Sequence, residues 1–228
     1  MMALAVHLKA TYLQMRIYIW CLIILILLGR LTDFIVSLFI DSSGPSTILS
    51  DGNMLILVLP IIAILLPLSY YKRIVYLGAS REQYFKGLLF VFAVYAAAIA
   101  LFNSLWFALE VSVIRKYTNT IDLIEAFHWD DFGFAGSFLY QTAFYLMAMA
   151  LLSMLISGYY HPIGWLLWAL LIAAIPIGTA IPSLRVHVVT FFNALLANES
   201  LAAGVGFNLM LFIVFVACGW LFTRGRTH

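Results

Sequence analysis

The stretch Tyr71–Lys86, YKRIVYLGASREQYFK, is polar and basic and lies between two long apolar runs. Each flanking run is about as long as a helix needs to cross a bilayer, roughly 20 residues. A short charged segment between two such runs is typical of a loop that joins two membrane-spanning helices. The stretch therefore predicts that the chain is an all-α membrane protein.

The composition of the whole chain supports the same fold class. Its 228 residues are 65% hydrophobic and only 10% charged, and the mean hydropathy is +1.06. Soluble domains carry about 25% charged residues. The net charge of +2 comes from basic residues scattered near span ends. We therefore expect a lipid bilayer as the surroundings, a single transmembrane domain over residues 1–228, and no nucleic-acid partner.

Six apolar segments have spanning length. They cover about residues 17–40, 53–71, 87–111, 136–158, 164–181 and 201–222. Pro60 and Pro67 are expected to kink the second span. Residues 1–16 place apolar side chains at helical spacing and predict an interfacial amphipathic helix. Residues 182–200 are apolar but too short for a span, and they predict one or two short re-entrant helices between spans five and six.

The distribution of basic residues orients these spans. With the N-terminus in the cytoplasm, the segments on that side carry eight of the twelve Lys and Arg residues, and the opposite segments carry three. The eight are Lys9, Arg16, Lys72, Arg73, Arg81, Lys86, Arg224 and Arg226. We therefore expect both termini and the residue 72–86 loop to be cytoplasmic.

The loop carries its own signals for local structure. Ser80 is placed as a helix N-cap, and Gln83 three residues later completes a capping box. Gly78 and Ala79 permit a tight turn before it. The sequence thus predicts a short helix, a turn and a second helix that continues into the third span. Such an ordered element suits docking of a soluble partner; the alternative is a solvated connector whose charges serve only orientation.

Polar residues also lie inside the predicted spans. Arg30 and Asp33 are three residues apart on the first span and can pair. The pair could line a transport path or form a subunit contact. The alternative is that Asp33 lies near the outer membrane interface and Arg30 extends its side chain to that interface. Asn103, Gln141 and Asn208 lie in spans three, four and six. Such residues usually serve helix packing, and a translocation path is the alternative.

Several chemical functions are disfavoured by the sequence. It contains no phosphate-binding loop of the G-x-x-x-x-G-K-[ST] type, no H-E-x-x-H motif and no G-x-S-x-G motif. Its five histidines lie in different segments. We therefore expect no catalytic residues and no metal site in this chain.

The segment Leu77–Gly87, LGASREQYFKG, resembles the L-G-x-[ST]-R-x-x-[FY]-x-x-G pattern of small bacterial ABC-2-type transporter permeases. In that family this segment is the coupling helix that binds the ATPase subunit. Such permeases have six spans, both ends inside, an N-terminal interfacial helix and short re-entrant helices between the last two spans. The motif covers eleven residues, whereas the topology covers the whole chain. The resemblance implies ATPase contacts at Gly78, Ala79, Ser80, Arg81, Glu82 and Tyr84.

The resemblance implies a permease subunit of an ATP-driven exporter in a bacterial plasma membrane. Its partners would be an ABC ATPase subunit and a second permease, either another copy or a paralogue. ATP and Mg²⁺ would be bound by the ATPase, so no cofactor is expected in this chain. Because few charges are available to line a path, we expect an amphipathic or hydrophobic cargo, with a peptide favoured over lipids or drugs. The alternative is an ion-driven secondary carrier that uses Asp33.

Overall fold

The computed structural model describes residues 13, 16–21, 23–29, 31–32, 48–76, 78–113, 115 and 120–226. Five helical stretches in this part are long and apolar enough to cross a membrane. They are Asp51–Tyr76, Arg81–Ser112, Asp130–Gly158, Pro162–Ala180 and Leu201–Gly225. The predicted class, an all-α membrane protein, agrees with this architecture. The first predicted span is described only in helical pieces, and the interfacial helix at 1–16 lies outside the described residues apart from Leu13 and Arg16.

The second predicted span is one continuous helical stretch with two departures from α-geometry. Its segments are α2 (Asp51–Met54), a 3-10 turn (Leu55–Leu57), α3 (Val58–Leu65), a π-turn (Leu66–Tyr70) and α4 (Tyr71–Tyr76). The 3-10 turn precedes Pro60, and the π-turn contains Pro67. A proline has no N–H for the α-helical ladder, so irregular geometry around it is expected.

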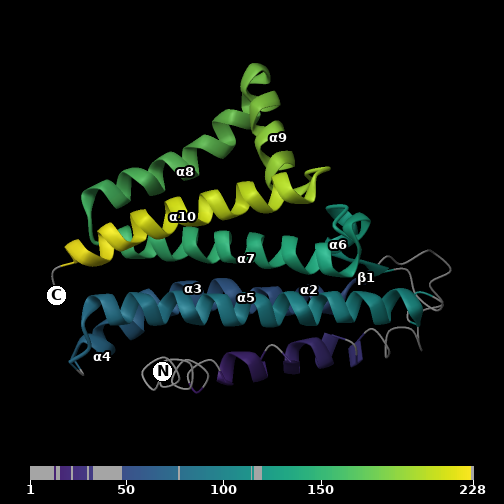
Figure 1. Ribbon diagram of the computed structural model, residues 1–228, viewed down its shortest axis with the longest axis horizontal. Helices are drawn as coiled ribbons and strands as arrows, with labels where there is room; N and C mark the ends of the chain where they lie inside the picture. The colour runs from purple at the N-terminus through teal and green to yellow at the C-terminus, as the bar shows by residue number, and fades with distance from the viewer. Residues whose placement is uncertain are drawn as a thin grey trace.

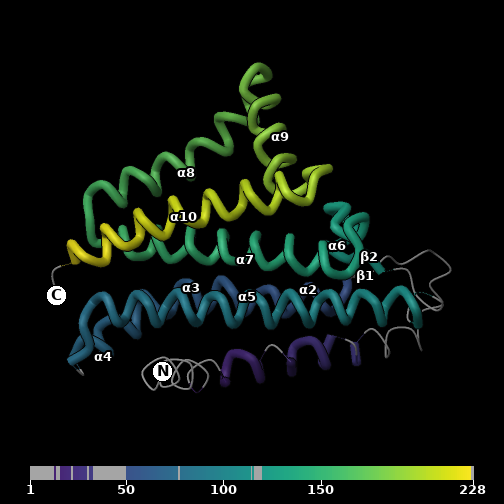
Figure 2. The backbone as a smooth tube through the Cα atoms, in the orientation of Figure 1, coloured from purple at the N-terminus to yellow at the C-terminus, as the bar shows by residue number. Residues whose placement is uncertain are grey.

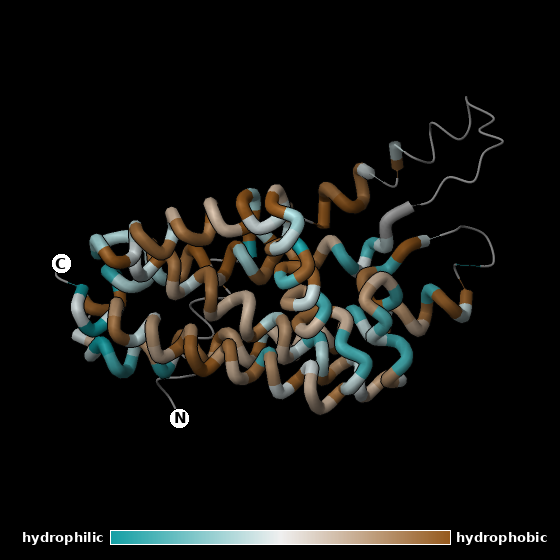
Figure 3. The backbone as a smooth tube through the Cα atoms, turned by 90° about the horizontal axis from the view of Figure 1, so that it is seen from above, coloured by the Kyte–Doolittle hydropathy of each residue, from teal (hydrophilic) through white to brown (hydrophobic). Residues whose placement is uncertain are grey.

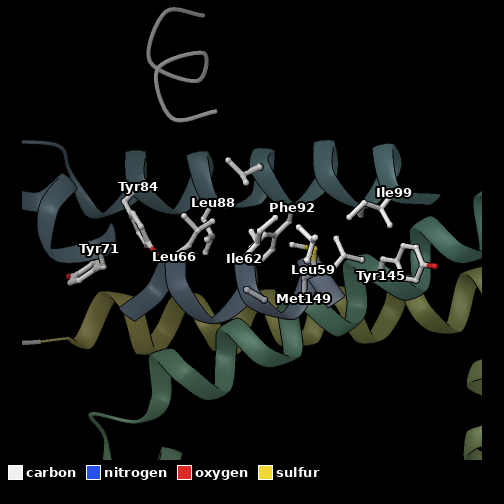
Figure 4. Close-up of a cluster of buried hydrophobic side chains, with 14 of the residues drawn as sticks. Leu59, Ile62, Leu66, Tyr71, Tyr84, Leu88, Phe92, Ile99, Tyr145 and Met149 are labelled. Atoms are coloured by element: carbon white, nitrogen blue, oxygen red, sulfur yellow. The ribbon is translucent and has the colours of Figure 1, made fainter. Parts of the chain in front are cut away.

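The core lies where this stretch packs against two long helices. α5 (Arg81–Ser112) and α7 (Gly133–Gly158) both contact α3, and α7 also packs along α10 (Leu201–Gly225) (Figure 1). Figure 4 shows the buried side chains between these helices, with Tyr71 and Tyr84 at one end of the cluster and Tyr145 at the other. Close packing of these large side chains fixes the helices relative to one another.

A small parallel pairing, which an all-α prediction does not include, joins two distant segments. β1 (Ile48–Leu49) pairs with β2 (Thr120–Ile121). Ser50 N extends the pairing by donating to Ile121 O at 3.0 Å. After β2 come α6 (Leu123–Ala126) and a 3-10 turn (Asp130–Phe132).

The last two helices before α10 diverge from the bundle. α8 (Pro162–Ala180) leaves obliquely, and α9 (Pro182–Leu196) returns to the start of α10 (Figures 1 and 2). The single helix α9 occupies the segment for which one or two re-entrant helices are predicted. Most side chains of α8 are exposed on all sides although the helix is apolar. An all-round apolar helix of this kind needs a non-aqueous surrounding.

Different elements lie at the two ends of the bundle. α4, the α7–α8 turn and the C-terminal residues lie at one end, here called the loop end, and β1, β2 and α6 lie at the other, the strand end (Figure 1). Figure 3 shows hydrophobic residues along the helices and more hydrophilic residues towards the two ends. This distribution is the one expected of helices that cross a bilayer.

Candidate functional site

The turn between α4 and α5 is tightly ordered by two helix caps. Gly78 has a φ of +88°, and its N–H donates to Val75 O at 3.0 Å while Ala79 N donates to Ile74 O at 3.2 Å. These are the two hydrogen bonds of a Schellman motif, whose left-handed position favours glycine. The turn predicted at Gly78 and Ala79 is therefore confirmed.

The capping box predicted at the start of α5 is also present. Gln83 N donates to Ser80 Oγ at 3.1 Å, and Ser80 N donates to Gln83 Oε1 at 3.0 Å. Each bond satisfies a backbone group that a helix terminus would otherwise leave without a partner. Since α4 ends and α5 begins with full caps, the turn between them is a defined shape.

Five of the six contact residues implied by the family resemblance lie at or near the surface of this turn. Gly78, Ser80 and Glu82 are exposed, and Ala79 and Arg81 are half-buried. Glu82 pairs with Lys86 one helical turn later, at 2.6 Å. Lys72, Arg73 and Tyr76 on α4 are exposed as well. We call this set of residues the loop surface; it comprises residues 72–73, 76, 78–82 and 86.

Tyr84 does not belong to the loop surface, which corrects the contact role implied for it. Its side chain is only 3% exposed and meets the Tyr71 ring edge-on, with centroids 5.2 Å apart. The spacing explains its position, because Tyr84 falls on the same face of α5 as the buried Leu88 and Val91. Tyr84 therefore supports the turn from inside.

Two arginines connect the loop end to the C-terminal helix. Arg81 Nη1 donates to Arg224 O at the end of α10. Arg226 Nη1 donates to Pro67 O at 2.9 Å, and its guanidinium lies over the rings of Tyr71 and Tyr160, 4.6 and 4.1 Å from their centroids. Cation–π contacts of this kind are favourable and directional. These contacts link the α4–α5 turn to the end of α10, and the end of α10 to the π-turn and the α7–α8 turn.

A polar network lies between α5 and α7 inside the apolar bundle. Gln141 Nε2 donates to Ser104 Oγ and Ser137 Oγ, both at 3.1 Å. Tyr145 OH donates to Gln141 Oε1 and accepts from Asn103 Nδ2, also at 3.1 Å each. The structure thus brings two of the predicted polar residues, Asn103 and Gln141, into one connected set. Such networks hold helices together where no water can compensate.

Asn208 is not part of that network. Its Nδ2 donates to Leu195 O at 3.0 Å, and Trp129 Nε1 donates to the neighbouring Leu196 O at 2.7 Å. Tyr140 OH donates to the same Leu195 carbonyl at 3.2 Å. These three side chains satisfy the carbonyls that the C-terminus of α9 leaves free. The last two predicted polar residues, Arg30 and Asp33, lie outside the described residues.

Two acidic side chains are buried at the strand end. Glu110 is 1% exposed and Asp122 is fully buried. Asp122 Oδ1 accepts from Ile124 N at 2.8 Å, but Asp122 Oδ2 and Glu110 Oε2 have no hydrogen-bond partner among the described residues. Arg115 lies close by and is paired with Glu125; this pairing raises the pKa of the Arg115 guanidinium.

No family model, curated protein or solved structure matches this chain.

A cavity of about 250 Å³ opens between α5, α6 and the start of α7. Apolar side chains such as Phe107, Val111 and Phe134 form most of its wall, and Ser104 and Ser137 of the polar network reach its lining. The cavity can therefore accommodate an apolar group next to hydroxyl groups. In the described part of the chain, no group of three or more His, Cys, Asp or Glu residues is placed to hold a metal ion.

The sequence alone does not identify the roles of Arg226, Asp122 and Trp129. It predicts Arg226 only as one of the basic residues that orient the spans. Asp122 did carry a local signal, because an Asp directly before a short helix is a good N-cap. Nothing local identifies the partners of Arg226 or Trp129, which are 159 and 67 positions away.

The buried carboxyl of Asp122 predicts a pH-dependent stability. Burial raises the pKa of Asp122, and the charge of Glu110 adds to the rise, whereas the Ile124 N–H, the Ser50 hydroxyl and Arg115 oppose it. Because the folded pKa exceeds the unfolded one, stability is highest below the unfolded pKa, about 3.9, and is lost as the pH rises through the folded pKa. Asp122→Asn should therefore be more stable than the native chain at pH 7, with the difference shrinking towards pH 4.

Thermal unfolding in detergent from pH 4 to 7.5 would measure this difference. The matched control is Asp130→Asn, which removes an exposed carboxylate at the same end of the bundle and should leave the pH profile unchanged. An Asp122→Asn profile parallel to that of the native chain would contradict the expectation.

Proposed function

We propose that this chain is the membrane-spanning subunit of an ATP-driven exporter of the ABC-2 type, and that a separate ATPase subunit binds its loop surface. The observation that carries the proposal is the doubly capped turn at Gly78–Ser80, exposed at the loop end and bonded to α10 through Arg81. Capped helix ends are common in proteins, but this turn is also exposed and bonded to a distant helix. An element that transmits movement from a soluble subunit to the spans needs both of these further properties.

The linkage between the turn and the spans supports a coupling role. Arg81 joins the turn to α10, and Arg226 joins the end of α10 to the π-turn at Pro67 and to Tyr160. Movement of the turn would therefore shift three spans together. The bundle would have two conformations. ATP binding to the ATPase would shift the equilibrium between them, because the ATP-bound ATPase binds one conformation more tightly than the other.

In this proposal the chain lies in a bacterial plasma membrane and has six spans. The loop end and both termini face the cytoplasm. Two such chains, identical or paralogous, form the path, and lipid covers the remaining apolar faces. ATP and Mg²⁺ are bound by the ATPase. The apolar faces of α8 support burial against lipid or a second permease, since its side chains have few partners within the described chain.

The cavity at the strand end supports an amphipathic or hydrophobic cargo. Its wall is mostly apolar, and its polar side chains are those of Ser104, Ser112, Ser137 and one acid, Asp130. Apolar pockets with a few placed polar groups suit ligands of mixed character. A peptide with an apolar face is the favoured cargo, and lipids or hydrophobic drugs are the next candidates.

Exchanging the charges of Glu82 and Lys86 tests the docking surface. The double variant Glu82→Lys with Lys86→Glu keeps an ion pair at the same spacing, so α5 should remain folded. It inverts the charges offered to the partner, and like-charge contacts at a docking surface cost several kcal/mol. We expect stimulated ATP turnover of the reconstituted complex to fall at least tenfold.

The partner ATPase is first recovered by mild-detergent purification of the tagged chain and mass spectrometry. Glu199→Lys, an exposed charge reversal after α9, serves as the control and should leave ATP turnover unchanged. Native turnover by the exchanged Glu82–Lys86 variant, with normal membrane insertion, would refute docking at the loop surface.

A second candidate function is an ion-driven carrier, and the buried acid Glu110, which lies inside the span Arg81–Ser112, favours it. Protonatable groups inside membrane proteins often mark ion paths. The acid first considered for this role, Asp33, lies outside the described residues. Under this function, Glu110→Gln would abolish uptake or efflux driven by a proton gradient in vesicles that contain the chain alone. Under the exporter proposal, the same variant leaves ATP-driven transport in place.

A further inference from the structure

Arg226 is a buried cation without a carboxylate partner in the described part of the chain. Its side chain is 4% exposed, and the ion pairs found among the described residues, Glu82–Lys86 and Arg115–Glu125, do not include it. Nη1 is bound by Pro67 O, but Nη2 has no hydrogen-bond partner there. A buried charge normally needs a counter-charge and filled hydrogen bonds. Two tyrosine rings supply only part of that compensation.

A small pocket adjoins Arg226 at the loop end. It has a volume of about 20 Å³ and is lined by Tyr71, Lys72, Val75, Tyr76 and Arg226. This is enough for one atom the size of a water oxygen. Lys72 and Tyr76 are exposed at the loop end, so a larger group can remain outside while one oxygen enters. The Tyr71 hydroxyl is likewise buried without a hydrogen-bond partner among the described residues.

The free donor and the neighbouring cation together select an anion. Guanidinium groups form short, strong hydrogen bonds with phosphate oxygens, and an ammonium adds a point charge. The pocket lies where an apolar span ends, which is the level of lipid headgroups in a bilayer. Basic pockets between spans on the cytoplasmic side bind such headgroups.

We propose that the Arg226 pocket binds a phosphate group. One phosphate oxygen enters the pocket and accepts from Arg226 Nη2, and Lys72 neutralises the charge that remains outside. The phosphate belongs to an anionic phospholipid or to free phosphate. Its binding would tie α4 to the residues after α10, since Lys72 and Arg226 come from these two segments. This site does not depend on an ATPase partner.

Binding is tested on the purified full chain in mild detergent. Thermal unfolding is measured with micelles containing phosphatidylglycerol, with matched micelles of phosphatidylcholine, with millimolar inorganic phosphate and with an acidic peptide. We expect phosphatidylglycerol to raise the unfolding midpoint and phosphatidylcholine to leave it unchanged. Native mass spectrometry counts the retained lipid. Protection by phosphatidylglycerol alone assigns the site to a lipid, and equal protection by inorganic phosphate assigns it to the free anion.

Variants distinguish phosphate binding in the pocket from general attraction to surface charge. Lys72→Gln removes the cation at the mouth and should weaken binding roughly fivefold, as expected for one basic residue near a lipid surface. Arg226→Gln removes the buried donor and should weaken it more than tenfold. Arg224→Gln removes an exposed charge two residues away that does not line the pocket, and should leave binding unchanged.

Three results would overturn the proposal. One is an unchanged midpoint with both phosphate sources. Another is a loss of binding in Arg224→Gln as large as that in Lys72→Gln, which would indicate that the phosphate is attracted by surface charge in general. The third is protection by an acidic peptide but by neither phosphate source, with loss of that protection in Lys72→Gln, which assigns the pocket to a protein carboxylate.

Discussion

Replacing Gly164 by alanine is expected to leave little correctly folded protein. Gly164 lies in the first turn of α8, directly against Gly158 at the end of α7, and a Cβ at Gly164 would overlap the carbonyl group of Gly158. The obstacle is backbone, which cannot move aside as a flexible side chain does. Overpacking in cores typically costs about 1–3 kcal/mol, and we expect a cost at or above the upper end of that range.

The matched control is Gly206→Ala on α10. A Cβ at Gly206 would have no neighbour within 4 Å. In a helix, alanine is more favourable than glycine by about 0.5–1 kcal/mol. The control should therefore be as stable as the native chain or slightly more stable. Size-exclusion profiles and thermal midpoints of detergent-purified variants would measure both, and equal monodisperse yields would show that the α7–α8 turn can relax.

The features predicted correctly from the sequence depend on near neighbours in the chain. The capping box needs only Ser80 and Gln83, and the Schellman turn needs only Gly78 and the residues just before it. The long apolar runs likewise predict helices, because a bilayer leaves the backbone few other ways to satisfy its hydrogen bonds. Local chemistry therefore determined the helices and the shape of the loop.

The features that were missed depend on contacts between distant segments. The β1–β2 pairing joins residues about 70 positions apart, and Arg226 reaches Pro67 from the other end of the chain. Tyr84 illustrates the same limit, because the motif implies a surface contact at this position whereas helix packing directs its ring inward. Asn103 and Gln141 were recognised as polar positions, but their connection through Tyr145 required the packing of α5 on α7.

Trp129 shows how one buried side chain positions a distant helix. α6 ends in a Schellman motif. His128 has a φ of +57°, its backbone N donates to Glu125 O at 3.0 Å, and Trp129 N donates to Ile124 O at 2.8 Å. This turn directs the Trp129 ring into the bundle, where it stacks on Tyr140 at 5.3 Å. Its Nε1 then binds Leu196 O at the end of α9. The ring therefore contributes both buried area and a helix cap.

Trp129→Ala is expected to destabilise the chain by about 3–5 kcal/mol, the usual cost of removing a buried aromatic side chain. Trp129→Phe keeps most of the ring but removes the donor, so Leu196 O loses a partner at a cost of about 1–3 kcal/mol. Trp165→Ala, which truncates a largely exposed tryptophan of α8, should cost less than either.

Thermal unfolding and limited proteolysis separate the two contributions of Trp129. If the Nε1 bond holds α9, Trp129→Phe should become sensitive to proteases at residues 197–200, between α9 and α10. Its thermal unfolding midpoint should fall only slightly. A Phe variant with native protease resistance and native stability would show that ring packing alone positions α9. The Asn208 and Tyr140 bonds to Leu195 O would then be sufficient to cap the helix.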